Sequence, residues 1–412
     1  MSSFSSRFVQ DKFAEYYGSD SLFVHPPTSI EKREFGFLLL KERIMLRHKA
    51  FRNADDLRSF LGRVIPSDVY YSSAYYERPD REMEEKGWLG ADLVFDIDAD
   101  HIPTPCAKEH DRWVCRSCGT TGRGLLPREC PACGERRFDE RIWPCEVCLE
   151  SAKAETMKLI DMLMKDFGFP PEEIRVSFSG HRGYHVHVES EDIRKLDQMA
   201  RKEIVDYLLG IGLETSFHGL ARNRAIAHVL AGPRLEDSGW RGRIARGTYE
   251  FLLTATPEEL KKIGLKKTIA NTISKHKKEL LESWKEVGPW GIVKGIGIES
   301  WRKIAEHGIT TQSSKIDTVV TTDIHRLIRL GNTLHGKTGL KKIAVAIKEL
   351  EDFDPFKGAV VFKEGTVKIY VSDAPQLRIG DETYGPYKEE TIELPTAAAM
   401  LLLCKKAAKV IR

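Results

Sequence analysis

The sequence contains no long apolar run and little net charge. Its longest wholly apolar stretch, Ala397–Cys404, is far shorter than the roughly 20 residues that cross a bilayer, and no secretory signal follows Met1. We therefore expect a soluble, cytoplasmic protein with no membrane partner. A net charge of +3 over 412 residues does not by itself indicate nucleic acid. We also find no internal repeat and no low-complexity tail.

Cysteine is almost absent outside one segment. Seven of the eight cysteines lie between Cys106 and Cys148, mostly as C-x2-C pairs, and Cys404 stands apart. In a reducing compartment this spacing favours metal binding over disulfides. Together with His110, these cysteines offer eight ligands, enough for two tetrahedral zinc ions. The alternative for His110 is an ordinary solvated loop histidine.

Spacing alone leaves the pairing of these ligands open, because eleven residues separate Cys118 from Cys130 and eleven separate Cys133 from Cys145. CRSCG and CPACG each carry a glycine after the second cysteine, as zinc knuckles do, whereas CEVCLE runs into a helix. An iron–sulfur cluster is the alternative that this spacing disfavours. We assign a ribbon zinc to Cys115, Cys118, Cys130 and Cys133, and an outer zinc to Cys106, His110, Cys145 and Cys148.

The segment ADLVFDIDAD places Asp96 and Asp98 two residues apart in an apolar run of β type. On a strand both side chains lie on one face, roughly 7 Å apart, while Phe95 and Ile97 face the other side. Two acids so placed can hold the divalent cations used in nucleotidyl transfer. The alternative is a solvated edge strand with scattered acids.

Two further segments carry groups suited to phosphate. In SGHRGYH, two glycines let the backbone approach a ligand, and Ser179, Arg182 and His185 supply donors. An ordinary hairpin is the alternative. Residues 315–339 supply another carboxylate followed by several cations, which indicates either a triphosphate site with a metal ligand or a salt-bridge network. These residues are Asp317, Arg326, Arg329, His335 and Lys337.

The chain alternates between strand-rich and helical regions. We expect helices over 4–17 and 151–167, strands within 34–51, 69–76, 91–100, 174–178 and 184–189, and a mostly helical stretch over 193–308. Beyond Gly339 we expect a helix, a hairpin around Glu364 and Gly365, and a final helix from about Thr396. The basic clusters 241–246 and 261–278, and the segment VKGIG at 293–297, could contact DNA phosphates, although a solvated helix face is the commoner meaning.

The order of these motifs resembles the catalytic small subunit of the archaeo-eukaryotic DNA primase. The D-x-D, the cysteine cluster, SG-x-RG-x-H and the D…RLIRL…LHGKTG block occur in that order. REFGF (33–37), VYYSSAYYERP (69–79) and CEVCLESAK (145–153) are also similar to the family. The stretch 193–308 carries no motif that matches.

The resemblance implies roles for individual residues. Catalytic Mg2+ or Mn2+ would be bound by Asp96, Asp98 and Asp317, with Asp323 as a rival for the third place. Glu34 and Arg47 would lie near the initiating nucleotide, and His181 stands where the family often has another basic residue. One zinc near the active site matches the outer group, and the ribbon resembles an insertion. The nucleotide phosphates would be held by Ser179, Arg182, His185, Arg329, His335 and Lys337.

The resemblance also implies an α+β fold, with a mixed sheet carrying the acids, a zinc-binding knob and a helical lobe. We expect residues 1–190, including the insert 102–148, and 309–412 to form the catalytic core, with 191–308 as the lobe. The implied reaction is primer synthesis from NTPs or dNTPs on a single-stranded DNA template, together with an iron–sulfur large subunit as heterodimer partner, in association with the nucleoid if the chain is archaeal. The alternatives are a repair primase-polymerase without a large subunit and a non-catalytic zinc-ribbon binder.

Overall fold

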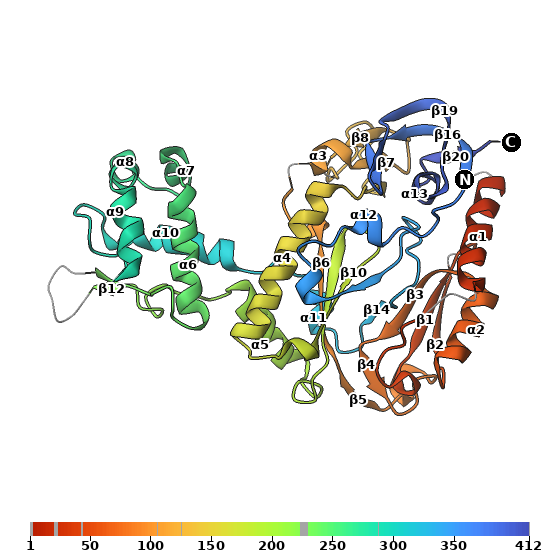
Figure 1. The fold of residues 1–412 in the computed structure, drawn as a ribbon, viewed down its shortest axis with the longest axis horizontal. Helices are drawn as coiled ribbons and strands as arrows, with labels where there is room; N and C mark the ends of the chain where they lie inside the picture. The colour runs from red at the N-terminus through yellow and green to blue at the C-terminus, as the bar shows by residue number, and fades with distance from the viewer. Residues whose placement is uncertain are drawn as a thin grey trace. The chain divides into compact units, whose positions relative to one another are not determined.

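The computed structural model describes residues 3–19, 24–42, 44–104, 106–124, 126–222, 230–286 and 288–411. The chain divides into two units. The first unit comprises residues 1–157, 170–202 and 316–412, and the second comprises 158–169 and 203–315. Figure 1 gives the order of their elements.

One four-stranded sheet of the first unit has the order β14-β3-β1-β2. Its strands are β1 (Phe35–Leu39), β2 (Met45–Lys49), β3 (Pro66–Ser72) and β14 (Leu327–Arg329). Helices α1 (Ser3–Gly18) and α2 (Ala54–Val64) lie on its outer side (Figure 1). Phe13, Leu57 and Leu61 of these helices are fully buried, so their apolar stripes account for this layer.

The second four-stranded sheet has the order β15-β10-β11-β6 and carries the D-x-D segment. Its strands are β6 (Leu93–Asp98), β10 (Ile174–Phe178), β11 (Gly183–Val188) and β15 (Ile343–Val345). Every residue of β11 is buried, as expected for a strand covered on both faces. Helix α4 (Glu146–Lys165) starts in this unit and ends in the second.

The α+β class is confirmed, but the expected mixed sheet is wrong in detail. All strand pairs among the described residues are antiparallel and are divided among several small sheets. The physical reason is the length of the connections. Strands β10 and β11, for example, are joined by four residues, too few for a parallel crossover.

The remaining elements of the first unit are short hairpins and a C-terminal layer. Helix α13 is buried on all sides, as its uniformly apolar sequence predicts. The other elements are β4 (Ala74–Tyr76), β5 (Trp88–Ala91), α3 (Ala107–His110), β7 (Arg112–Cys115), β8 (Thr121–Arg123), β9 (Phe138–Arg141), α11 (Thr318–Thr322), α12 (Pro355–Gly358), β16 (Thr366–Ala374), β17 (Leu377–Ile379), β18 (Glu382–Tyr384), β19 (Tyr387–Pro395), α13 (Thr396–Cys404) and β20 (Ala408–Val410).

The second unit is mostly helical. Trp290 and Trp301 are almost completely buried in it, and helices α6 and α10 approach closely where Gly247 meets Gly308. A side chain at Gly247 would lie 2.6 Å from the Gly308 carbonyl oxygen, so this crossing requires glycine. The elements are the end of α5 (Gln198–Leu209), β12 (Ala221–Arg222), β13 (Leu230–Ala231), α6 (Gly239–Thr254), α7 (Pro257–Lys262), α8 (Lys267–Lys275), α9 (Lys277–Glu282) and α10 (Ile298–Gln312).

Two expectations for the C-terminal region are wrong. The hairpin does not turn at Glu364 and Gly365, because these residues precede β16, whose partner β19 follows the small inserted β17–β18 hairpin. After Gly339 the chain forms β15 and the four-residue helix α12 in place of a longer helix. Pairing of Val345 with Val176 of β10 outweighs the local helical pattern.

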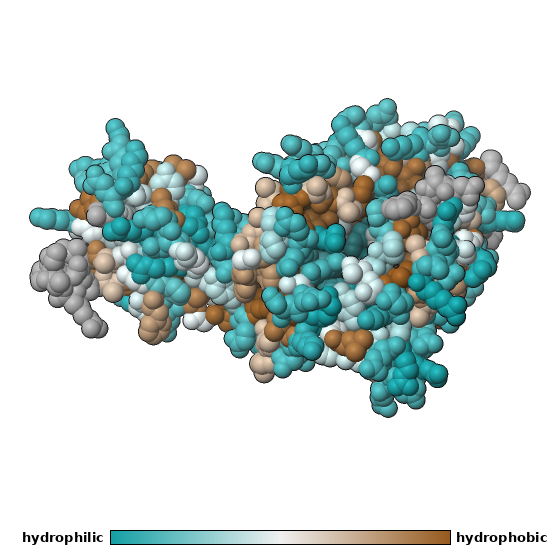
Figure 2. Space-filling model, turned by 60° about the horizontal axis from the view of Figure 1, so that its bottom comes forward, coloured by the Kyte–Doolittle hydropathy of each residue, from teal (hydrophilic) through white to brown (hydrophobic). Residues whose placement is uncertain are grey.

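Within the part of the chain that is described, no helix is long and apolar enough to cross a membrane. Hydrophilic residues cover most of the face drawn in Figure 2.

Candidate active site and metal centres

Strand pairing places the D-x-D acids opposite the glycine-rich turn. Asp96 pairs with His185, and Asp98 pairs with Gly183, the first residue of β11. A side chain at Gly183 would lie 2.0 Å from the Ile97 carbonyl oxygen, so only glycine allows the two strands to approach here. His185 Nε2 lies 3.5 Å from the Asp96 carboxylate.

The third acid joins the first two through the backbone. The Asp317 amide donates to the Asp96 carbonyl oxygen at 2.8 Å, and the Asp317 carboxylate caps helix α11 by accepting from the Val319 amide at 2.9 Å. Burial, followed by the charges of Asp98 and Asp317, raises the pKa of Asp96 to about 7. This mutual repulsion fits a site for cations, whose charge would relieve it.

Asp323 does not share this environment. Its carboxylate accepts from the His325 amide at 2.9 Å, at the far end of α11. The carboxylates that raise the pKa of Asp96 are Asp98 and Asp317. The geometry thus groups Asp317, not Asp323, with the D-x-D pair.

A cluster of basic side chains lies beside the glycine-rich turn. The rings of His181 and His335 stack with centroids 4.9 Å apart, and Lys405 places Nζ 2.8 Å from His181 Nε2. Gly180 adopts φ +86°, and a side chain there would lie 3.1 Å from His335 Cβ. The turn therefore needs glycine both for its conformation and for the close approach of His335.

Within this basic cluster, Lys405 has no carboxylate partner among the described residues. Lys405 is 7% exposed, and burial, followed by the charges of Lys337 and Arg182, lowers its pKa to about 7. Burial also holds the pKa of His181 and His335 well below the usual range. A polyanion bound beside this cluster would be stabilised, because it would supply the negative charge that Lys405 lacks.

Arg182 connects the acids to the zinc-binding segment. Its guanidinium forms ion pairs with Asp100 and with Asp111, the latter at 3.1 Å. The side chain is almost fully buried, and its Nε has no hydrogen-bond partner. Burial lowers the pKa of Arg182 to about 10, opposed by the charge of Asp98.

Arg329 lies in contact with a buried carboxylate. Its Nη1 donates to Asp68 at 2.6 Å and to the Leu334 carbonyl oxygen at 3.3 Å. Burial alone would lower the pKa of Arg329, but Asp68 and Tyr70 more than offset it and the pKa is raised. Its charge reaches His335 and also lowers the pKa of that ring.

Glu34 and Arg47 form a separate cluster. The Glu34 carboxylate is fully buried and pairs with Arg47 at 2.9 Å and with buried Lys86 at 3.2 Å. The pKa of Glu34 is lowered because these cations outweigh the opposing effect of burial.

Ser179 lies at the glycine-rich turn, where its hydroxyl accepts a hydrogen bond from the His181 amide at 3.3 Å.

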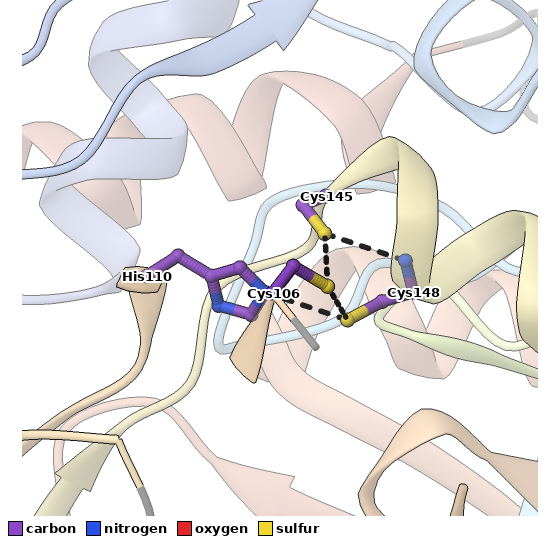
Figure 3. A group of neighbouring side chains, drawn as sticks. All are labelled: Cys106, His110, Cys145 and Cys148. Carbon is purple, nitrogen blue, oxygen red and sulfur yellow. Dashed lines mark hydrogen bonds between the residues drawn. The ribbon is translucent and has the colours of Figure 1, made fainter. Parts of the chain in front are cut away.

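Each cysteine group gathers around a common centre. The ligand atoms of Cys106, His110, Cys145 and Cys148 all lie within 4.8 Å of one another, as do those of Cys115, Cys118, Cys130 and Cys133. These are the two groups proposed from the knuckle glycines. Figure 3 shows the outer group, in which the Cys106–Cys148 and Cys106–Cys145 sulfur distances are 3.4 and 3.5 Å.

These distances fit metal ligands and not disulfides. A tetrahedron with Zn–S bonds of about 2.3 Å has edges of roughly 3.8 Å, close to the observed separations. All eight cysteines are free thiols. Cys115 and Cys133 lie 3.6 Å apart, as do Cys118 and Cys130. Each group could therefore hold one metal ion.

A carboxylate lies behind the histidine of the outer group. His110 Nε2 faces Cys148, while its Nδ1 lies 2.7 Å from Asp111, which also accepts from the Trp143 amide at 3.1 Å and from Arg182. Such a carboxylate fixes the tautomer and the ring orientation of a metal-binding histidine. Asp111 thus joins the outer metal group to Arg182.

Sequence reasoning missed three residues of this region. Asp111 had a signal, because it directly follows a candidate metal-binding histidine. Lys405 had none, because it lies in an ordinary Lys-Lys pair after an apolar helix, more than 60 residues beyond LHGKTG. Lys342, also missed, is buried, and its pKa is lowered to about 7 by burial and by Arg329.

Comparisons with known proteins also indicate the primase small-subunit family. A family model described as the DNA primase small subunit matches residues 143–347. Proteins named DNA primase small subunit PriS are 34% identical in Methanothrix thermoacetophila, over 100% of both chains, and 34% identical in Methanococcoides burtonii, over 98% of this chain and 97% of the relative. That of Archaeoglobus fulgidus is 32% identical over 97% and 96%.

These relatives favour neither a repair primase-polymerase nor a non-catalytic zinc-ribbon binder. The similarity extends over 98–100% of this chain and 97–100% of the relatives. The chain belongs to the family of archaeo-eukaryotic DNA primase small subunits.

Proposed function

We propose that this chain synthesises primers on a single-stranded DNA template by nucleotidyl transfer at the site formed by Asp96, Asp98 and Asp317. The observation that carries this proposal is the meeting of three carboxylates beside a cluster of basic side chains; burial and the neighbouring acids raise the pKa of Asp96. The acids would bind metal ions, and the neighbouring basic side chains would bind negatively charged phosphates. A nucleoside triphosphate with its bound metal ions supplies both.

The three acids would hold Mg2+ or Mn2+. Bound there, two such ions lower the pKa of an attacking hydroxyl and neutralise charge on the reacting phosphate and the leaving pyrophosphate. Asp317 is held in place from both sides, by its amide on β6 and by its carboxylate on α11. Its position is therefore fixed before substrate arrives, which is what electrostatic catalysis requires.

The nucleotide phosphates would be bound by donors from three parts of the chain. Ser179, Arg182 and His185 come from the glycine-rich turn and β11, and His335 and Lys337 come from the loop after β14. We add Lys405, whose Nζ touches the His181–His335 stack. Arg329 would act through its charge, because its hydrogen bonds go to Asp68 and Leu334.

Residues 1–190 and 309–412 would supply this chemistry, and 191–308 would supply none of it. Structural zinc in both cysteine groups would stabilise the knob, and the outer zinc would hold Asp111, and with it Arg182, in position. The relatives are named small subunits, which implies a large subunit. We propose that this partner carries an iron–sulfur domain and that the complex acts on DNA in the cytoplasm.

The test is primer synthesis by the purified chain on a single-stranded template, with labelled NTPs and dNTPs in separate reactions, alone and with the copurified large subunit. We expect metal-dependent synthesis of short products. The Asp96→Asn variant serves as the matched control, because it keeps the shape of the side chain and removes its charge. If this variant made products at the wild-type rate, the three acids would not be the catalytic centre.

A further inference from the structure

The second unit contains a basic segment that the proposed primer synthesis does not use. Residues 257–305 hold eleven Lys and Arg against six Glu and no Asp, a formal charge of +5, whereas the whole chain carries +3. Lys266, Lys267 and Lys294 are exposed and have no ion pair among the described residues. A surface with this excess of unpaired cations fits a polyanionic partner.

The same segment contains a structural repeat. Gly264 and Gly295, 31 residues apart, both adopt a left-handed conformation, with φ of 85° and 91°. Each is followed by a buried apolar residue, Leu265 or Ile296, and then by the start of a helix, α8 or α10. The Ala270 amide donates to the Lys266 carbonyl oxygen at 3.0 Å, and the equivalent Trp301 amide donates to the Gly297 carbonyl oxygen at 3.2 Å.

The expectation that the chain has no internal repeat is therefore wrong here. The two copies share only the hairpin glycine and three buried positions, with different residues at each of the three: Leu265 and Ile296, Ala270 and Trp301, and Ile273 and Ile304. So short a pattern does not stand out in a sequence. The backbone conformation and the burial of these positions make it visible.

The first hairpin contacts α10, the helix that follows the second hairpin. Lys303, on α10, donates from Nζ to the carbonyl oxygen of Gly264 at 2.6 Å. Lys303 lies five residues after Ile298, the first residue of α10, which corresponds to about 8 Å along the helix axis. The hairpin before α8 therefore lies against the first two turns of α10.

Both helix starts lack a capping side chain. Neither Lys266 nor Gly297, the residues at the N-cap positions, makes a side-chain capping hydrogen bond. The first amides of both helices thus remain available to an outside acceptor. With the three lysines, they provide donors and positive charge suited to phosphate oxygens.

The surface fits a duplex better than a single strand. Proteins that bind single strands stack the bases on exposed aromatic rings. The aromatic residues of this segment, Trp284, Trp290 and Trp301, are at most 7% exposed. Amides and lysines contact the regular phosphates of a double helix without reading its sequence.

We infer that the paired-hairpin surface, residues 263–267 and 294–298, binds the phosphates of double-stranded DNA without sequence preference. This inference does not depend on the proposed chemistry, because the surface contains none of the residues assigned to it.

The first experiment compares two triple variants of the full chain. One carries Lys266→Ala, Lys267→Ala and Lys294→Ala, and the control carries Lys275→Ala, Lys278→Ala and Lys285→Ala, so each loses three lysines of the same segment. Binding to a labelled duplex of mixed sequence is measured at several salt concentrations. We expect the first variant to lose about tenfold or more in affinity and to lower the slope of log affinity against log salt by roughly two to three. We expect the control to stay near the wild type.

The second experiment separates binding from folding. Lys266→Asp and Gly297→Asp together place a carboxylate at both N-caps, where the extended backbone at each position suits a capping side chain. We expect the midpoint of thermal unfolding to stay the same or rise, while duplex binding is lost. Primer initiation on a single-stranded template should continue at the wild-type rate, so failure of this inference and failure of the proposed chemistry are distinguishable.

Three results would overturn the inference. Wild-type duplex affinity in both the triple-lysine and the double-aspartate variants would show that the hairpins do not contact DNA. Equal losses in the hairpin and control triples would assign binding to general charge. A greater loss for a single-stranded oligonucleotide than for the duplex would assign the surface to the template strand.

Discussion

We expect the Asp68–Arg329 pair to stabilise the first unit more than it contributes to nucleotide binding. Asp68 and Arg329 are 6% and 7% exposed and lie 2.6 Å apart. Removing one partner of a buried ion pair leaves an uncompensated charge and typically costs about 3–5 kcal/mol. In Arg329→Met, Asp68 would retain, among the described residues, its contacts with Ser67 and the Gly336 amide. We therefore expect Arg329→Met to lower the free energy of unfolding by about 3–5 kcal/mol.

The double variant Asp68→Leu with Arg329→Met is the control. It removes both charges and should cost less than either single substitution, because no charge remains buried alone. Hydrogen exchange followed on peptides from β3 and β14 reports the unfolding of this unit separately from the other. A cost below about 1 kcal/mol for Arg329→Met, with nucleotide affinity reduced more than about tenfold, would refute the reasoning and make Arg329 a direct phosphate ligand.

The remaining predictions concern the basic cluster and the metals. Lys405→Met should weaken triphosphate binding by about 1.5–3 kcal/mol at pH 6, measured by calorimetry. The wild-type affinity should be full below pH 7 and fall as the pH rises through the lowered pKa of Lys405, about 7, and this fall should be smaller in the variant; the same pH profile in both would show that Lys405 does not contact the phosphates. Arg182→Ala and His335→Ala should each weaken nucleotide binding by about 1.5–3 kcal/mol, with template affinity little changed; loss of template affinity instead would assign them to the template groove. Elemental analysis should find two zinc ions per chain. Cys130→Ser should lose one zinc and keep primer synthesis, whereas Cys145→Ser should lose the other and destabilise the core; loss of both metals in Cys130→Ser would contradict the grouping.

Elements with strong local patterns could be predicted from the sequence. The alternation around Ile174–Phe178 gives β10 at its observed bounds, and the uniformly apolar run after Thr396 gives α13. The hairpin expected at Glu364 and Gly365 could not be placed correctly, because the partner of β16 is chosen by tertiary pairing across an inserted hairpin. Local turn residues carry no information about that choice.

Some residues of the candidate site could likewise be predicted from local motifs, and others could not. The acids Asp96 and Asp98 follow from spacing on one strand, and the two cysteine groups follow from the glycines of the ribbon knuckles. Lys405 and the role of Asp68 depend on which side chains the fold buries together, and neither lies in a motif. The paired hairpins became visible only through the left-handed glycines and the burial of the residues that follow them.

The central claim is that Asp317 completes the catalytic acids, and the most direct measurement compares Asp317→Asn with Asp323→Asn. Both lie at the ends of α11, and both carboxylates accept a backbone hydrogen bond that asparagine can also accept. We expect Asp317→Asn to reduce the rate of template-directed nucleotide incorporation by at least about 10²-fold, since removal of a preorganised electrostatic group typically costs that much. Asp323→Asn should remain close to the wild type. A near-normal rate in Asp317→Asn with a large loss in Asp323→Asn would contradict the account.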